Sequence, residues 1–263
     1  MSELKTAGEG VAFFPLGGEG PPTLLLHGFG SDHLLWLANQ QALAGAATVA
    51  ALDLPGHGDS SRDVGEGTIA ELAVRVESVL DERGLKNIHV IGHSLGGGLA
   101  LVMAERRPDL VASLTLIAAA GLGRSVDDAF LEEFPRLATP EAATALLQRL
   151  VVRPRLINKF LVARVLEQLA RPGAREALQR IARGIIADEA TIAGALEAAR
   201  VRGLPRLLIW GEADTISPLS KERLDQFGDE TLLVEEAGHL PHVEQPRLVN
   251  ERIREFLVRQ TST

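Results

Sequence analysis

Short apolar runs alternate with longer amphipathic stretches along the first half of the chain. The apolar runs end in turn residues and predict β-strands over residues 23–27, 48–53, 89–92 and 113–118. Apolar side chains recur at helical spacing over residues 69–82 and 95–107. This alternation is typical of βαβ units and a mostly parallel sheet. Residues 11–14 precede a cluster of Gly and Pro and predict an antiparallel edge strand.

The pattern changes in the middle of the chain, where strand-like runs become scarce. Helical patterns separated by Pro or Gly predict helices over residues 127–134, 140–152, 156–170, 174–186 and 190–200. Strand patterns return at residues 207–211 and 231–234, and a helix over 247–258 follows. The sequence therefore predicts an α/β core, residues 1–121 and 203–263, that is interrupted by a helical cap, residues 122–202.

A serine flanked by glycines stands where the strand at residues 89–92 gives way to the next helix. Ser94 has Gly92 and Gly96 two residues away on either side, in a G-x-S-x-G pattern. A serine in a sharp strand-to-helix turn has a strained backbone and an exposed Oγ, and its neighbours must be nearly without side chains. The spacing predicts a nucleophile at Ser94, but the bare pattern also occurs by chance and requires a base and an acid.

The loops after the last two predicted strands supply both groups. A serine hydroxyl is a weak nucleophile until a base removes its proton and an acid orients that base. Strand-to-turn-to-helix sites of this kind have the chain order Ser, Asp or Glu, His. We predict Asp214 as the acid, with Glu212 as its rival, and His239 as the base, with His242 as its rival.

An oxyanion hole requires two backbone N–H groups that point at the developing alkoxide. Leu95, directly after the nucleophile, offers one of them. The loop after the strand at residues 23–27 offers the other, and Phe29 is the candidate because Gly28 and Gly30 give the backbone around it freedom.

Composition narrows the class of protein. Of the 263 residues, 46% are hydrophobic and 24% charged, as in globular proteins with a core. The net charge of −8 and the lack of basic clusters argue against nucleic acid or an anionic membrane as partner. The absence of cysteine excludes disulfides and thiolate metal sites. We see no signal-peptide core and no run of about 20 apolar residues, so we expect a cytoplasmic protein without metal or cofactor. A homo-oligomer stays open.

Several stretches together resemble the α/β-hydrolase superfamily, in its capped, small-molecule type. They are residues 27–30, 53–60, 92–97, 210–214 and 238–239. The resemblance implies a mostly parallel sheet flanked by helices, with a helical cap inserted after strand six, and a serine hydrolase of esterase type. Residues 111–118 and 120–123 resemble more narrowly the hydrolase-like domain of acetoin dehydrogenase acyltransferase subunits. The sequence contains no lipoyl or peripheral-subunit segment, so the resemblance does not imply acyl transfer to lipoate within a complex.

The substrate is predicted only as a class. Cap residues such as Phe130 and Phe160, together with Gly28, are expected to line the pocket, which favours small, mainly apolar carboxylic esters. Ser at position 94, and a chain without Tyr, argue against dehalogenases and epoxide hydrolases. Carbon–carbon bond hydrolysis, acyl transfer and perhydrolysis on the same triad remain alternatives. So does a non-catalytic ligand-binding protein, although the presence of all three triad residues favours an enzyme.

Overall fold

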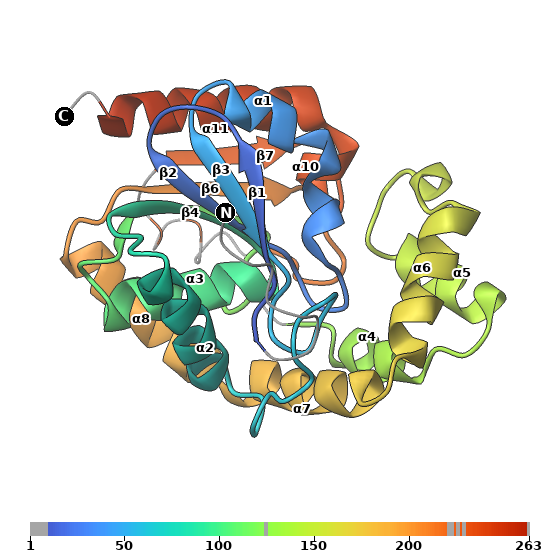
Figure 1. Ribbon diagram of the computed structural model, residues 1–263. Coiled ribbons are helices and arrows are strands. Elements are labelled where there is room, and N and C mark those ends of the chain that lie inside the picture. Colours follow the sequence, from blue (N-terminus) through green and yellow to red (C-terminus); the bar gives the residue numbers. More distant parts are fainter. Residues whose placement is uncertain (1–9, 124–125, 220–223, 225–226, 228–229, 262–263) are drawn as a thin grey trace.

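The computed structural model describes residues 10–123, 126–219, 224, 227 and 230–261, so most of the N-terminal segment expected to lack a signal-peptide core lies outside it. Within the described residues, seven strands form one sheet in the order β1-β3-β2-β4-β5-β6-β7 (Figure 1). Their bounds are β1 Phe13–Gly17, β2 Pro22–Leu26, β3 Thr48–Leu52, β4 Ile88–His93, β5 Val111–Ile117, β6 Arg206–Gly211 and β7 Glu230–Val234.

All neighbouring strands are parallel except the edge pair β1 and β3, which is antiparallel as expected. Every predicted strand is present with shifted ends. A central parallel strand is buried on both faces, which explains why β4 and β6 are apolar runs rather than alternating patterns.

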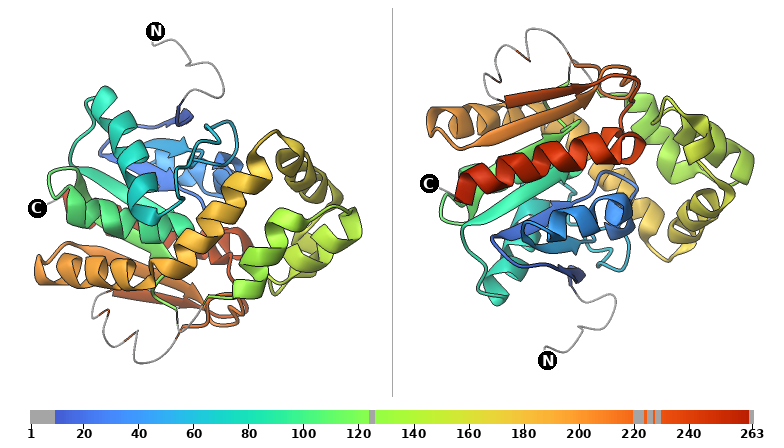
Figure 2. Two further views of the ribbon diagram at one scale, coloured as in Figure 1. Left: turned by 90° about the horizontal axis from the view of Figure 1, so that it is seen from below. Right: turned by 90° about the horizontal axis from the view of Figure 1, so that it is seen from above.

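Helices cover both faces of the sheet (Figures 1 and 2). On one face lie α2 (Ile69–Glu82), α3 (Leu95–Arg106) and α8 (Glu189–Val201), and on the other lie α1 (Gln40–Ala44) and α11 (Pro246–Thr261). Helix α2 begins at a capping box, in which Thr68 Oγ1 accepts from Glu71 N and the Glu71 carboxylate accepts from Thr68 N. Within the described residues, no helix is both long and apolar enough to cross a membrane.

A helical segment joins β5 to β6 and extends beyond one end of the sheet (Figure 1). It contains α4 (Asp128–Glu133), α5 (Pro140–Gln148), α6 (Lys159–Ala170) and α7 (Ala174–Ala187), and then α8. Short helices in the described residues are η1 (His33–Ala38), η2 (Phe134–Arg136), η3 (Pro154–Leu156) and α10 (Pro241–Glu244).

The insertion expected after strand six of the family pattern follows β5, which is the fifth strand of the described residues. The family pattern implied six strands before the cap, but the described part of the chain has five, because a single strand precedes the Gly- and Pro-rich turn before β2. Helix α8 packs on α3 along the sheet, while α4 to α6 lie away from it (Figure 1). A separate cap domain over residues 122–202 stays a prediction.

Two helical glycines allow a matched test of how closely α3 packs on the sheet. A Cβ at Gly97 would lie 2.5 Å from Ala119 Cβ, whereas a Cβ at Gly194 would meet nothing within 4 Å. We expect G97A to lower the free energy of unfolding by about 1–3 kcal/mol through overpacking, and G194A to raise it by up to about 1 kcal/mol through helix propensity. Urea denaturation measures both, and equal effects of the two variants would contradict the close packing.

Candidate active site

Ser94 occupies a strained turn between β4 and α3. Its backbone has φ 51° and ψ −116°, a conformation that side chains other than glycine rarely adopt. A Cβ at Gly92 would lie 2.4 Å from Gly96 O, and a Cβ at Gly96 would lie 2.4 Å from Leu26 O. The turn therefore needs glycine on both sides of Ser94, for the steric reason expected from the sequence.

His239 and Asp214 are hydrogen-bonded to each other beside this turn. His239 Nδ1 donates to Asp214 Oδ2 over 2.8 Å, and their side chains are 4% and 1% exposed. The other carboxylate oxygen, Asp214 Oδ1, accepts from the backbone N–H groups of Ile216 and Ser217. These bonds orient the carboxylate and put the imidazole proton on Nδ1, which leaves His239 Nε2 as an acceptor.

Within the described residues, neither rival side chain is hydrogen-bonded to Asp214 or His239. His242 is fully buried between the rings of Trp36 and His93, and neither of its ring nitrogens has a hydrogen-bond partner among the described residues. Burial, reinforced by the nearby His239, lowers the pKa of His242 to about 3. Glu212 has an exposed side chain, and its backbone N–H donates to Val234 O. The arrangement in space thus favours His239 over His242 and Asp214 over Glu212.

The loop that carries Phe29 lies against the serine turn. A Cβ at Gly28 would lie 3.1 Å from Ser94 Cβ and 2.6 Å from His93 Nδ1. Within the part of the chain that the structure describes, the N–H groups of Phe29 and Leu95 donate to no other group. Both are therefore available to a ligand oxygen, and their use as an oxyanion hole stays a prediction.

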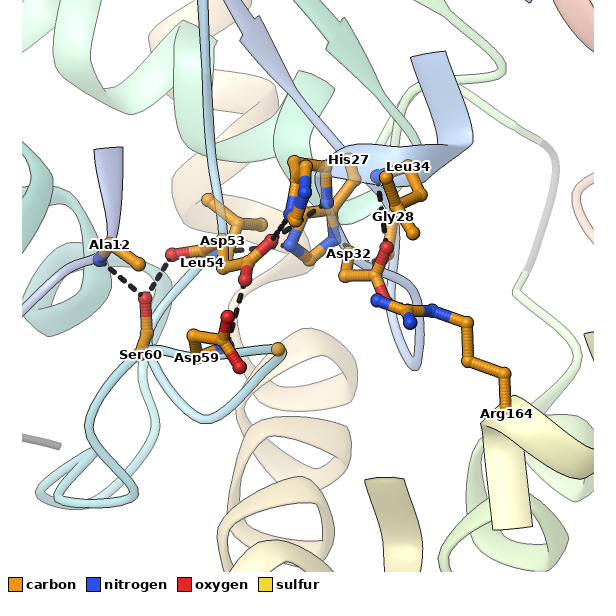
Figure 3. A network of polar contacts seen from close by, with 12 residues as sticks. Ala12, His27, Gly28, Asp32, Leu34, Asp53, Leu54, Asp59, Ser60 and Arg164 are labelled. Atoms are coloured by element: carbon orange, nitrogen blue, oxygen red, sulfur yellow. Dashed lines mark hydrogen bonds and ion pairs between the residues drawn. The ribbon is translucent and has the colours of Figure 1, made fainter. Parts of the chain in front are cut away.

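Hydrogen bonds of His27 fix the loop that carries Phe29 (Figure 3). His27 Nδ1 donates to Gly28 O over 2.8 Å, and His27 Nε2 accepts from Leu54 N over 2.9 Å. The imidazole is neutral in this pattern, in agreement with the burial that lowers the pKa of His27. His27 thus joins the Phe29 loop to the loop after β3.

Asp32, His33 and Asp53 form a cluster whose possible ligand atoms lie within 4.8 Å of one another. Asp53 Oδ1 accepts from His33 N and His33 Nδ1, and its Oδ2 accepts from Asp59 N. Asp32 Oδ1 accepts from Leu34 N, and its Oδ2 pairs with Arg164 of α6 (Figure 3). Because these oxygens already accept from N–H donors, we interpret the cluster as a structural network rather than a metal site.

His93, which directly precedes Ser94, contacts the candidate base His239. Its Nε2 donates to the backbone oxygen of His239 over 2.9 Å, and the two rings lie 4.9 Å apart. Burial, together with the nearby His242 and His239, holds the pKa of His93 well below its ordinary value. The position next to Ser94 is its only sequence signal.

Ser94 and His239 line the same cavity, which has a volume of about 450 Å³. The predicted pocket residues Gly28, Phe130 and Phe160 are all in its lining. Phe160 lies at the edge, since 74% of its surface is exposed. The other apolar lining residues include Phe29, Leu131, Phe134, Leu147, Val165, Ile185 and Ile216. The cavity therefore combines a serine hydroxyl and an imidazole with a predominantly apolar wall.

The buried histidines make stability depend on pH. The unfolded chain protonates His242 near pH 6.5, but the folded chain does so only near pH 3, so acidification favours unfolding between these values. At pH 5 this linkage costs about 2 kcal/mol. We expect H242F to reduce the loss of unfolding free energy between pH 7 and pH 5 by that amount, as measured by urea denaturation.

His33 provides a control of opposite sign, because the hydrogen bond to Asp53 raises its pKa against the effect of burial. Because protonation of His33 favours the folded chain, H33Q should make the loss of unfolding free energy between pH 7 and pH 5 larger. An unchanged pH dependence in H242F would contradict a neutral His242.

Comparison with known proteins places this geometry in a family. Residues 21–246 match the family model described as alpha/beta hydrolase fold. Over 260 residues the chain is 36% identical to the dihydrolipoyllysine-residue acetyltransferase component of the acetoin cleaving system of Pseudomonas putida, covering 97% of this chain and 68% of that relative. About a third of the relative thus lies outside the match.

Solved structures of hydrolases have the same fold. A meta-cleavage product hydrolase from Pseudomonas fluorescens superposes with a TM-score of 0.82 at 25% identity, over 95% of this chain and 94% of that one. A thermophilic esterase from Thermogutta terrifontis superposes with a TM-score of 0.76 at 26% identity, over 95% and 93%. The family model matches most of this chain, and the strained serine turn agrees with it. This chain therefore belongs to the α/β-hydrolase family.

Proposed function

We propose that the protein is a serine hydrolase that cleaves small, mainly apolar carboxylic esters through an acyl-enzyme. The observation that carries the proposal is the hydrogen bond between His239 and Asp214 beside Ser94, at the wall of an apolar cavity. A serine in a strained, glycine-flanked turn has little structural purpose of its own, and a buried acid–histidine pair beside it supports a catalytic role.

The reaction follows from the positions of these groups. His239 Nε2 takes the proton of Ser94 Oγ as the oxygen attacks the ester carbonyl carbon, and Asp214 stabilises the imidazolium that forms. The carbonyl oxygen becomes an alkoxide that accepts from the N–H groups of Phe29 and Leu95. His239 then gives its proton to the leaving alcohol. A water molecule, deprotonated by His239, cleaves the acyl-enzyme in the same way and releases the acid.

The cavity supports the proposed substrate class. A volume of about 450 Å³ suits a small molecule, and the Phe, Leu, Val and Ile side chains of its wall favour apolar acyl or alcohol groups. The ring of Phe134 contacts those of Phe29 and Phe130, with centroids 5.6 Å and 5.9 Å apart, and all three rings belong to this wall. The likeness to an esterase also supports ester cleavage.

Two alternative reactions use the same residues. The likeness to a meta-cleavage product hydrolase favours carbon–carbon bond hydrolysis, and the 36% identity to an acetyltransferase component favours acyl transfer. A panel of p-nitrophenyl esters of rising acyl length, a vinylogous 1,5-diketone and a thiol acceptor separates the three. Turnover of the diketone alone would replace the ester proposal with carbon–carbon cleavage.

The nucleophile is tested by removing its oxygen. S94A should abolish both ester hydrolysis and covalent labelling by a fluorophosphonate, with unchanged thermal unfolding, because no other group then forms the acyl-enzyme. Gel fluorescence and mass spectrometry locate the label in the wild type. A label on another serine, or one that persists in S94A, would overturn the proposal.

The acid is tested by a pair of matched amides. D214N should lower kcat by roughly 10⁴-fold, the size seen for the same change in other triads, because the imidazole loses its oriented tautomer. E212Q removes an exposed charge two residues away and should leave kcat within about twofold. Steady-state kinetics on a p-nitrophenyl ester measure both. A silent D214N with an inactive E212Q would make Glu212 the acid.

A further inference from the structure

Glu244 is a buried carboxylate behind the active site that the proposed reaction does not use. It ends α10, five residues after His239, and is 5% exposed. Its Oε2 accepts from Gly238 N over 2.6 Å, directly before the catalytic histidine. Its Oε1 accepts from Val152 N over 2.9 Å and from Arg153 N over 3.1 Å, in the segment between α5 and η3. One side chain thus joins the histidine loop to the helical segment between β5 and β6.

Further bonds join the same two regions. His239 N donates to Leu150 O over 2.8 Å, and Thr215 Oγ1, in the loop of the acid, donates to Arg149 O over 3.3 Å. A Cβ at Gly238 would lie 2.8 Å from Leu150 O, so the backbones touch without a side chain between them. The backbone of His239 is thus held by Leu150 on one side and by His93 on the other.

We propose that Glu244 is a positioning residue, which fixes the imidazole of His239 against Ser94 by clamping the histidine loop to residues 149–153. The proposal rests on the proposed function, since it concerns the base of that triad. Residues 149–153 then help to position His239, although they supply no side chain to the reaction.

The chemistry of the three bonds explains why a carboxylate stands here. All three partners are N–H donors, and they approach both oxygens, so the side chain must accept at both ends. Hydrogen bonds to an ionised acceptor are also stronger than neutral ones. The amide of glutamine has the same shape but only one accepting oxygen. In E244Q its NH₂ group must face an N–H group of either Gly238 or residues 152–153, and one side of the clamp is released.

The test compares matched glutamates. E244Q should slow the fluorophosphonate labelling of Ser94 and lower kcat by roughly 10- to 100-fold, with KM changed less than kcat, because a small displacement of a catalytic group is costly. Hydrogen exchange should accelerate together at residues 152–153 and 238–239. E77Q is the control, because Glu77 is also 5% exposed and pairs with Arg106 far from the site. It should lower the melting temperature but leave labelling unchanged.

A second variant covers the case in which E244Q does not fold. V152P retains Glu244 and removes one N–H donor on the other side of the clamp, and it should slow labelling by a smaller factor. Normal labelling in a folded E244Q or V152P, or an equal loss in E77Q, would overturn the positioning role. Failure of the proposed function would give a different result. The wild type would not be labelled at Ser94, whereas hydrogen exchange in E244Q would still accelerate at residues 152–153 and 238–239.

Discussion

The close approach of bare backbone at the carboxyl ends of the strands is the constraint on which the active site depends. Cβ atoms at Gly96, Gly211 and Gly238 would each fall within 2.8 Å of a carbonyl oxygen of another segment. These contacts join the serine turn to the end of β2, the loop of Asp214 to the loop of His239, and the loop of His239 to Leu150. Side chains at these positions would push the segments apart, so the geometry of the proposed catalytic groups is set by residues that take no part in the proposed reaction.

Several buried, neutral imidazoles lie in and around the loops of the candidate active site. His27, His57, His93 and His242 are all buried, and burial lowers the pKa of each. A neutral imidazole can donate at one nitrogen and accept at the other, which His27 does between Gly28 and Leu54. Such rings join loops without adding charge near His239, where a positive charge forms in the proposed reaction. The buried polar groups thus serve the site at a cost in stability at acid pH.

The sequence predicted those helices and strands that are long enough for their apolar residues to show a period. The strands, helix α2 over residues 69–82 and the order of Ser94, Asp214 and His239 follow from local chemistry, and the structure brings Asp214 and His239 together. Helix α1 was not predicted, because five residues are too few for a helical period. Glu244 and Asp32 were missed because their partners lie 91 and 132 residues away in the chain, a distance that no local pattern spans.

The strand order has a consequence for the chain as it is synthesised. After β4, each new strand is added at the same edge of the sheet, β5 first and β7 last. Ser94 and the helices between β5 and β6 therefore leave the ribosome before Asp214 and His239, which follow β6 and β7. In the proposed reaction, a nascent chain in this order carries the nucleophile without the groups that activate it. Ester hydrolysis would then begin only when the sheet is complete, so partly made chains would not react with the esters around them.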